Sequence, residues 1–306
     1  MTAGTTVEEP YTVELTPEVY AYVQPDGGWC LSNAGFVSDG GRTLLVDTAA
    51  TRRRALWLRE AVEAAGAAVP SVIVNTHHHG DHTYGNCVFP EATVVAHHNS
   101  RREQLDAGHQ LHLIWPRTDF GEISISAPTL TYDDSVTLHI GDTEVRVLHP
   151  GVAHTTGDSV VWLPHRRVVF TGDLVFAGGT PFIPFGSLSG SLRALDLLRS
   201  LDARTVVPGH GPLTDASAYD ATERYLRFVG TLAEEGRAKG ITPLEAARQA
   251  DLGEFARWRE PERLVANLHR AYAELAGEPG GSRLDLVALL TDMTEMNGGT
   301  PVACHA

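Results

Sequence analysis

The stretch "VNTHHHGDH" at residues 74–82 places four imidazoles and one carboxylate within six residues, directly after an apolar run. His77 and His79 are two positions apart at the end of an expected strand, where side chains of the same parity point the same way. Asp81 and His82 follow at an expected helix start and can face a second point nearby. Imidazole and carboxylate groups are ligands that Zn²⁺ favours, and two ions about 3.5–4 Å apart need about this many groups. The stretch predicts a metal site; the alternative is a polar loop that is rich in histidine by chance.

Three later positions supply groups that the histidine stretch lacks. They are His154 in "GVAHTTGD", Asp173 in "VVFTGDLVF" and His210 in "TVVPGHGP". Each comes just after an apolar run and has a glycine nearby. We expect the chain topology to bring these strand ends together with residues 77–82.

Short β-like runs separated by turn signals dominate the first half of the chain. Strands are expected at residues 19–23, 34–37, 43–46 and 71–74, with a helix at 52–65 between the last two. The second half repeats this order, with strands expected at 144–148, 159–163, 167–171 and 204–207 and a helix at 192–201. Two sheets that pack face to face under outer helices form a four-layer αββα sandwich. The predicted fold class is therefore α/β.

The chain reads as one sandwich domain with additions. We assign residues 1–214 to the domain that carries the site and residues 215–290 to a helical C-terminal cover of the same domain. Residues 291–306 are expected to form a mobile tail. Residues 99–135 are too long for a simple connection, which favours a substrate-pocket insertion. The alternative for this segment is a helix and a hairpin that decorate the scaffold.

The net charge disfavours some classes of partner. Acidic residues outnumber Lys and Arg by 38 to 24, and the resulting charge of −14 opposes binding to nucleic acid or to an anionic membrane. The N-terminus shows no basic region followed by an apolar one, and no run of about 20 apolar residues occurs. Three separated cysteines without a CxxC pair fit reduced thiols. We therefore expect a cytoplasmic protein, whose oligomeric state the sequence leaves open.

The histidine stretch and the three later groups together resemble the motif set of the metallo-β-lactamase-fold hydrolases, over residues 18–212. The resemblance implies two metal positions and one bridging group. Their ligands would be His77, His79 and His154 for the first metal, Asp81, His82 and His210 for the second, and Asp173 for both. The expected cofactors are two Zn²⁺ ions, although the sequence does not separate zinc from iron or manganese.

Such a site implies hydrolytic chemistry. Metal ions held by Asp81, Asp173 and the other ligands would supply hydroxide near neutral pH and polarise a carbonyl oxygen of an ester, thioester or amide. Asp47, which ends the strand "LLVD", resembles an acidic residue that supports a metal ligand in this fold, with a turn cap as the alternative. His78 is expected beside the site or in solvent, and one of the histidines at 97–98 is expected to orient a ligand.

Departures from other branches of the fold narrow the class of enzyme. Asp173 stands where lactamases with a cysteine ligand have that cysteine, and His79 stands where flavo-diiron oxygen reductases have a glutamate. The negative charge disfavours a nuclease. A glyoxalase II-like thioesterase shares the "THHH" signature, but it binds glutathione carboxylates with basic C-terminal residues, and this chain is mixed in charge there. Lactonases, β-lactamases and a non-catalytic metal-binding scaffold are further alternatives; a scaffold would show lost ligands, and none is lost.

Three loops, at residues 27–37, 115–123 and 180–198, resemble those of the cyclase/thioesterases of bacterial aromatic (type II) polyketide pathways. The resemblance implies a small-molecule polyketide substrate that is tethered as a thioester to an acyl carrier protein. The metal site would promote ring cyclisation, thioester hydrolysis or both.

Aromatic side chains in these loops are candidates for the wall of a substrate pocket, with ordinary core packing as the alternative for each. They are Trp29, Trp115, Phe120, Phe182 and Phe185. An acidic carrier would also require local positive charge on an otherwise acidic protein. The candidate side chains are Arg101, Arg102 and Arg117.

Overall fold

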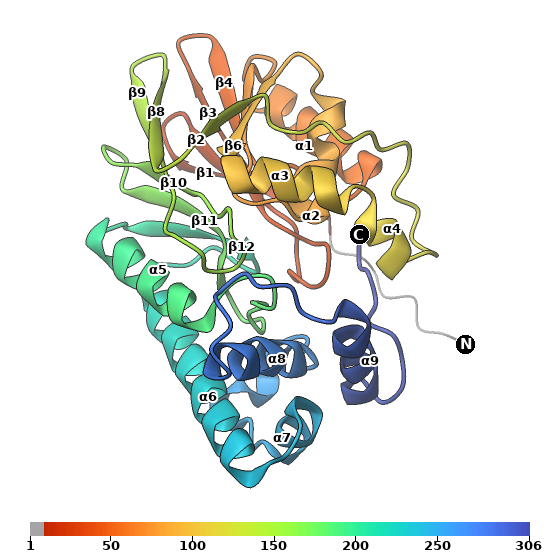
Figure 1. Ribbon diagram of the computed structural model, residues 1–306. Helices are drawn as coiled ribbons and strands as arrows, with labels where there is room; N and C mark the ends of the chain where they lie inside the picture. Colours follow the sequence, from red (N-terminus) through yellow and green to blue (C-terminus); the bar gives the residue numbers. More distant parts are fainter. Residues whose placement is uncertain (1–8) are drawn as a thin grey trace.

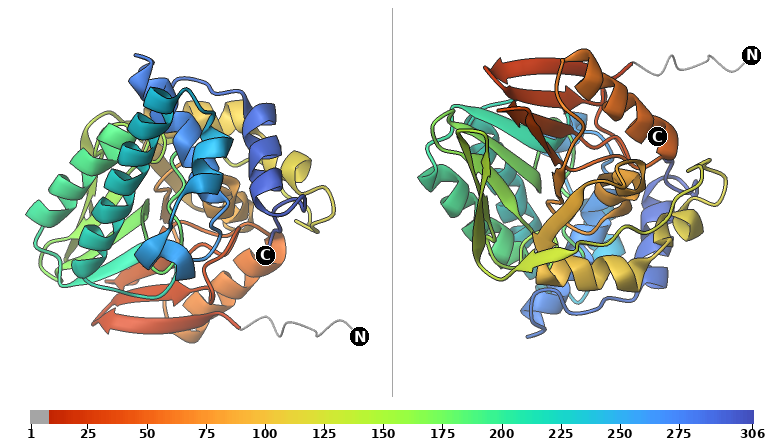
Figure 2. Two further views of the ribbon diagram at one scale, coloured as in Figure 1. Left: turned by 90° about the horizontal axis from the view of Figure 1, so that it is seen from below. Right: turned by 90° about the horizontal axis from the view of Figure 1, so that it is seen from above.

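The computed structural model describes residues 9–306, which form two sheets, outer helices and a group of helices after the last strand (Figures 1 and 2). The first sheet contains β1 (Tyr11–Thr16), β2 (Val19–Val23), β3 (Ala34–Asp39), β4 (Arg42–Val46), β5 (Val72–Val74), β6 (Thr93–His97) and β7 (Leu130–Tyr132), in that order. Its pairs are antiparallel up to β4 and parallel from β4 to β7.

The second sheet has the order β12 (Thr205–His210), β11 (Val168–Phe176), β10 (Val160–Leu163), β9 (Thr143–Leu148) and β8 (Ser135–Ile140). Only the β11–β12 pair is parallel. Every strand expected from the sequence occurs, but β11 continues five residues beyond its expected end, so Asp173 lies within the strand and not after it. Strands β1, β7 and β8 were not expected. Strand β1 is half exposed, β7 lies at the end of the 99–135 segment, and β8 begins at the last residue of that segment.

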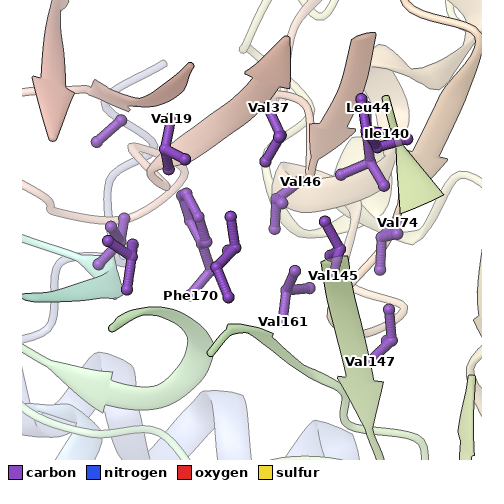
Figure 3. Packing of buried hydrophobic residues seen from close by; sticks show 14 of the residues in the cluster. Val19, Val37, Leu44, Val46, Val74, Ile140, Val145, Val147, Val161 and Phe170 are labelled. Atoms are coloured by element: carbon purple, nitrogen blue, oxygen red, sulfur yellow. The ribbon is translucent and has the colours of Figure 1, made fainter. Parts of the chain in front are cut away.

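Alternating side chains give each sheet two apolar faces. In β4, Leu44 and Val46 enter the core between the sheets, whereas Leu45 enters the core under an outer helix. Figure 3 shows the core between the sheets, where Val145 and Val161 of the second sheet lie opposite the first. Full burial of one such side chain stabilises the fold by about 1.5–3 kcal/mol. The two sheets are therefore joined by an apolar layer, as the alternation in sequence predicts.

Helices cover the outer faces of both sheets. Helix α1 (Arg52–Ala64) begins where the side chain of Thr51 accepts a hydrogen bond from the backbone N–H of Arg54, and it packs on the first sheet. Helix α5 (Leu188–Ser200) begins at Ser187 in the same way and packs with α6 (Ser217–Lys239) on the second sheet. The order helix, sheet, sheet, helix confirms the predicted four-layer αββα sandwich.

The chain after β12 is helical, as expected. Helix α6 is followed by α7 (Pro243–Gln249), a 3₁₀ turn (Gly253–Arg257), α8 (Arg263–Leu275) and α9 (Leu286–Met296). These helices pack around an apolar core in which Leu264, Leu268 and Met293 are buried together with Phe176 and Phe182 of the sandwich domain. No helix among residues 9–306 is long and apolar enough to cross a membrane.

The segment expected to be a mobile tail, residues 291–306, has defined contacts instead. Its first residues belong to α9, whose N-terminus is capped by the side chain of Asp285. Beyond the helix, the indole N–H of Trp115 donates to the carbonyl of Val302 at 2.8 Å. The backbone N–H of His305 donates to the carbonyl of Trp29 at 3.0 Å. The segment therefore lies against two loops of the sandwich domain.

The 99–135 segment contains most of α3 (His98–Ala107), all of α4 (Gln110–Ile114), an irregular stretch and β7. Figure 1 shows α3 and α4 on the same side of the molecule as α9. This segment and the C-terminal helices therefore approach each other beyond the strand ends, where the predicted metal ligands lie.

Candidate metal centre

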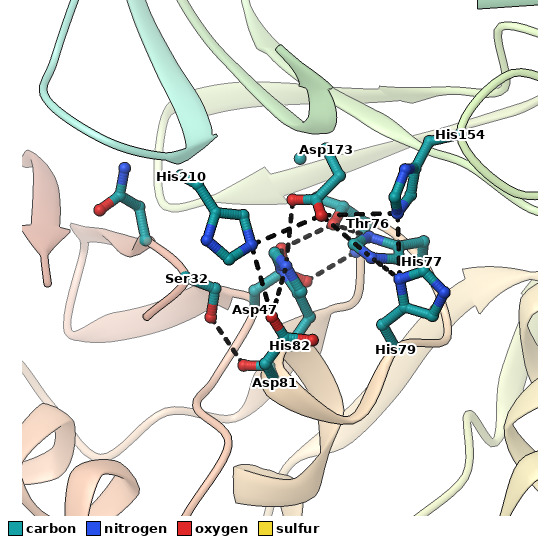
Figure 4. Close-up of polar contacts among 12 residues, drawn as sticks. Ser32, Asp47, Thr76, His77, His79, Asp81, His82, His154, Asp173 and His210 are labelled. Atoms are coloured by element: carbon teal, nitrogen blue, oxygen red, sulfur yellow. Dashed lines mark hydrogen bonds and ion pairs between the residues drawn. The ribbon is translucent and has the colours of Figure 1, made fainter. Parts of the chain in front are cut away.

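The side chains predicted to bind metal lie together at one edge of the sandwich (Figure 4). They come from the loop after β5, the short helix α2 (Gly80–Thr83), the loop after β9, strand β11 and the end of β12. Because these segments converge, seven groups from four separate parts of the chain face one another. They are His77, His79, Asp81, His82, His154, Asp173 and His210.

Glycines beside the cluster allow the segments to approach closely. A Cβ atom on Gly209 would lie 2.0 Å from Oδ1 of Asp173. A Cβ atom on Gly172, whose φ is +51°, would lie 2.5 Å from Oγ1 of Thr76. Only glycine fits such positions without displacing a neighbour. The glycines that accompany Asp173 and His210 in the sequence thus serve the packing of the site.

The first group of ligand atoms surrounds His79. Its Nδ1 lies 3.1 Å from Nε2 of His77 and 3.0 Å from Nε2 of His154. Oδ2 of Asp173 lies 3.4 Å from Nε2 of His154 and 3.9 Å from Nε2 of His77. One atom from each of these four residues lies within 4.8 Å of the others.

The second group surrounds Asp81. Its Oδ2 lies 3.4 Å from Nε2 of His210 and 3.8 Å from Nε2 of His82. Asp173 also contacts this group, since its Oδ1 lies 3.1 Å from Nε2 of His82 and its Oδ2 lies 3.5 Å from Nε2 of His210. The carboxylate of Asp173 therefore lies between the two groups.

Buried partners fix the orientation of the imidazoles. Oδ2 of Asp47 lies 2.9 Å from Nδ1 of His82, and the same carboxylate accepts hydrogen bonds from the backbone N–H and the hydroxyl of Thr76 at 2.7 and 2.6 Å. Nδ1 of His77 lies 3.0 Å from the hydroxyl of Thr76, and Nδ1 of His210 lies 3.1 Å from the carbonyl of Gly27. Such partners on the outer nitrogen direct the other nitrogen inward. Asp47 thus contacts a site histidine directly, in agreement with the first of its two interpretations.

Three imidazoles of the cluster are held in the neutral form that binds metals. Burial, reinforced by neighbouring imidazoles, lowers the pKa of His77 and of His79 well below the usual range. Burial also lowers the pKa of His154 to about 4, although the carboxylate of Asp173 opposes this. These three side chains therefore present uncharged nitrogen lone pairs at neutral pH.

The other imidazoles face negative charge. Burial opposes protonation of His82, but the carboxylates of Asp173, Asp47 and Asp81 outweigh it and raise its pKa well above the usual range. The same balance raises the pKa of His210 to about 9. Burial would raise the pKa of Asp173, but the surrounding imidazoles lower it well below its usual range. A cluster with this much buried carboxylate charge requires protons or metal ions as compensation.

The ligand atoms of the cluster do not satisfy one another fully by hydrogen bonds, and their types suit metal ions. Nε2 of His82 and Oδ1 of Asp173 are buried and lie 3.1 Å apart, yet neither has an aligned hydrogen-bond partner among residues 9–306. Buried polar atoms without a partner are rare in native proteins. Five imidazoles and two carboxylates arranged in two groups match the ligand types that zinc and similar divalent ions prefer.

An apolar pocket opens beside the cluster. Trp29, Trp115, Phe182 and Phe185 line it, and side chains of the cluster, including His79, form part of its surface. The enclosed part of the pocket is narrow, with a volume of about 70 Å³, and its lining is mostly apolar. The ring of Trp29 lies 5.7 Å from that of Trp115 and 5.0 Å from that of Phe182, so the aromatic wall is continuous.

Phe120 was predicted to line this pocket, and the prediction was wrong. Its ring is buried and packs 4.6 Å from His112 and 6.0 Å from Tyr84. Its backbone carbonyl accepts a hydrogen bond from the N–H of Arg52 at the start of α1, which turns the side chain into the core beneath Trp115. Phe120 therefore supports the pocket wall from behind.

The structure also places residues in the pocket that the sequence did not indicate. Leu290 and Met293 of α9, Val302 after it and Arg263 of α8 all line the pocket. The spacing of Leu286, Leu290 and Met293 is helical and apolar, which is a signal for a helix. Sequence spacing carries no signal that this helix reaches a pocket whose aromatic wall comes from residues between 29 and 185.

His78 lies beside the cluster, with its ring 4.6 Å from that of His79 and its Nδ1 3.1 Å from Oε2 of Glu103. The histidines at 97–98 have other neighbours. The ring of His97 stacks on that of His149 at 3.8 Å, and Nδ1 of His98 lies 2.8 Å from a carboxylate oxygen of Asp133. The expected role of residues 97–98 in orienting a metal ligand finds no support in these contacts.

Comparison with known proteins agrees with this geometry. The profile of the Metallo-beta-lactamase superfamily matches residues 27–210. A hydroxyacylglutathione hydrolase of Methylococcus capsulatus is 31% identical over 194 residues, which are 62% of this chain and 64% of that protein. The human acyl-coenzyme A thioesterase MBLAC2 is 29% identical over 173 residues, which are 50% of this chain and 60% of that protein. The chain thus spans somewhat less than two thirds of the length of these relatives.

Solved structures show the same fold. A metallo-beta-lactamase from Pontibacter korlensis superposes with a TM-score of 0.57 and 23% sequence identity, over 72% of this chain and 99% of that one. The DIM-1 metallo-beta-lactamase superposes with a TM-score of 0.56 and 22% identity. At this level of identity the likeness establishes the architecture and carries no information about the substrate.

Proposed function

Because the chain belongs to the metallo-beta-lactamase superfamily, we propose that it is a metal-dependent hydrolase of acyl thioesters. The observation that carries the proposal is the seven-residue cluster, which opens directly into an apolar pocket. The names of two relatives, a hydroxyacylglutathione hydrolase and an acyl-coenzyme A thioesterase, both describe an acyl group carried on a thiol.

The cluster offers two positions for metal ions. His77, His79 and His154 would hold the first, and Asp81, His82 and His210 would hold the second, with Asp173 as a ligand of both. When bound, two Zn²⁺ ions would activate water near neutral pH and polarise a carbonyl group. Asp47 holds His82 in the orientation that this arrangement needs.

The chain's own residues determine how a thioester lies. The aromatic wall of Trp29, Trp115 and Phe182 would hold an apolar acyl group, so that its carbonyl lies beside the cluster. Trp115 and Phe182 are buried, so this wall limits the access of bulk water to the carbonyl group. Water adds to that carbon, the C–S bond breaks, and the products are a carboxylic acid and a free thiol.

A second candidate function uses the same cluster. The loops that resemble cyclase/thioesterases of aromatic polyketide pathways contribute Trp29, Trp115, Phe182 and Phe185 to the pocket. A wall of four aromatic rings suits a flat, partly aromatic substrate. This candidate adds ring closure of a carrier-bound polyketide to the hydrolytic step.

One set of measurements tests the proposed function. Protein reconstituted with zinc should bind two ions per chain and release thiol from acyl thioesters, and His79→Ala should abolish the release. His165→Ala, on a side chain that is 79% exposed, is the matched control and should behave like the parent. Protein with two bound ions that releases thiol from no acyl thioester would contradict the proposal. A cyclised product from a polyketide thioester would favour the second candidate.

A further inference from the structure

A second cavity adjoins the pocket beside the cluster. Most of its lining comes from α3, α4 and residues 281–286, the last of which begins α9. Gln110, Phe185 and Leu286 line both cavities. We call the second cavity the outer groove. A molecule that fills the pocket can therefore continue along the outer groove toward the surface.

Two arginines at the outer groove are available to bind an anion. Arg102 and Arg283 both line the groove. Within residues 9–306, Arg102 has no carboxylate partner within 4.0 Å, and the nearest partner of Arg283 is Asp106 at 4.0 Å. The Arg283 side chain is 94% exposed. Two weakly paired cations at one groove are notable in a chain whose net charge is −14, because most of its surface repels anions.

Two carboxylates, those of Glu103 and Asp106, also line the groove. Oε2 of Glu103 lies 3.1 Å from Nδ1 of His78, and Oε1 accepts a hydrogen bond from the hydroxyl of Thr156. Glu103 therefore contacts these two side chains and forms no ion pair with Arg102. Asp106 is exposed and contacts only Arg283 among the cations of the described chain. An incoming phosphate can displace such a weak surface contact.

The remaining wall of the groove is mixed in polarity. Leu113, which is 83% exposed, Ala107 and Leu284 contribute apolar surface to the groove. Ser282 and Gln110 contribute polar atoms. A ligand that follows this path must therefore combine alkyl segments with amide or hydroxyl groups and must end in negative charge.

We propose that the outer groove binds the phosphopantetheine arm of a coenzyme A thioester, with its phosphates at Arg102 and Arg283 and its acyl group in the pocket. This inference rests on the proposed function and specifies the thiol carrier. The pantetheine arm alternates short alkyl segments and amides, which matches the mixed wall. Arginine is well suited to phosphate because its guanidinium group donates two parallel hydrogen bonds.

The test compares one acyl group on three thiols: coenzyme A, glutathione and N-acetylcysteamine, which lacks phosphate. Arg102→Ala/Arg283→Ala should lower kcat/KM for the coenzyme A thioester about tenfold and leave the N-acetylcysteamine thioester unchanged. Arg193→Ala/Arg204→Ala, which removes two exposed arginines elsewhere, is the matched control and should change neither value. Added salt should weaken the parent's advantage with coenzyme A.

The outcomes separate this inference from the proposed function. Equal kcat/KM of the double variant and the parent with the coenzyme A thioester would overturn the inference alone. A higher kcat/KM of the parent with the glutathione thioester than with the coenzyme A thioester would also overturn it. If no thioester is cleaved, the proposed function is wrong. The inference about the groove is then tested by calorimetry of coenzyme A binding, and equal affinity of the double variant and the parent would overturn it.

Discussion

The contact between Asp47 and His82 allows a quantitative prediction about metal binding. Replacement of Asp47 with Asn keeps the size of the side chain and retains Oδ1 for the backbone N–H of Thr76. It places an NH₂ group where Oδ2 now faces both Nδ1 of His82 and the hydroxyl of Thr76. The hydroxyl can rotate and accept, but the imidazole N–H then faces another donor. The variant therefore loses the partner that orients one metal ligand.

The expected cost follows from that single contact. A hydrogen bond to a charged group contributes about 1.5–3 kcal/mol, and each 1.4 kcal/mol corresponds to a factor of ten in affinity. We therefore expect Asp47→Asn to weaken the binding of one of two zinc ions roughly 10- to 100-fold, which is the range typical of residues that support metal ligands. The other ion should keep its affinity, because His77, His79 and His154 do not contact Asp47 directly.

Competition with a chromophoric chelator measures both affinities, and circular dichroism establishes that the fold persists. Asp39→Asn is a matched control. Its carboxylate also accepts from a backbone N–H and a threonine hydroxyl, those of Asp142 and Thr143, but it lies at an exposed hairpin without a histidine. Parent-like affinity for both ions in Asp47→Asn would refute the assignment of Asp47 as the support of His82.

Three further changes test other parts of the structure. Asp173→Asn should lower the rate of thioester hydrolysis about a hundredfold or more with the fold intact, because this one carboxylate contacts both ligand groups. Kinetics and metal analysis on one preparation test this, and near-parent turnover with two tightly bound ions would contradict it. Trp115→Ala should lower kcat/KM about tenfold without loss of metal, and unchanged kinetics would remove Trp115 from the pocket. Burial and the neighbouring imidazoles lower the pKa of His97 to about 4 in the folded chain. In the unfolded chain this imidazole is protonated below about pH 6.5, whereas in the folded chain it stays neutral until about pH 4. The contribution of His97 to the free energy of unfolding is therefore fully present above pH 6.5 and is lost as the pH falls toward 4, by about 1–2 kcal/mol. In urea titrations at several pH values, His97→Asn, which keeps a helix cap, should lose less stability over this range than the parent. An equal loss in the variant and the parent would contradict the prediction.

Much of the sandwich could be anticipated because its signals are local. Alternation in β4 places Leu44 and Val46 on one face and Leu45 on the other, and this pattern is visible in sequence. The juxtaposition of His77 with Asp173 followed from a rule about strand ends, and the structure brings these residues together. The ligand roles themselves remain predictions for the metal-binding experiments.

What could not be anticipated depends on contacts between distant segments. The hydrogen bond from Trp115 to Val302 joins residues 187 positions apart, and no spacing rule points to it. The same limit explains why the position of Phe120 was predicted wrongly. An aromatic residue in an irregular stretch is expected to be buried, but its type does not indicate whether it lines a pocket or packs in the core behind the pocket wall. The course of the loop decides between the two.

The metal-ligand cluster and part of the substrate pocket come from different parts of the chain. Every side chain of the candidate metal centre comes before residue 211, whereas Leu290, Met293 and Val302 of the pocket come after residue 285. Mutations in α9 and the residues after it can therefore reshape the space offered to a substrate while the metal-ligand cluster keeps its sequence and its supporting contacts. Variation in about 20 residues at one end of the chain can therefore change the pocket while all seven side chains of the metal-ligand cluster are kept.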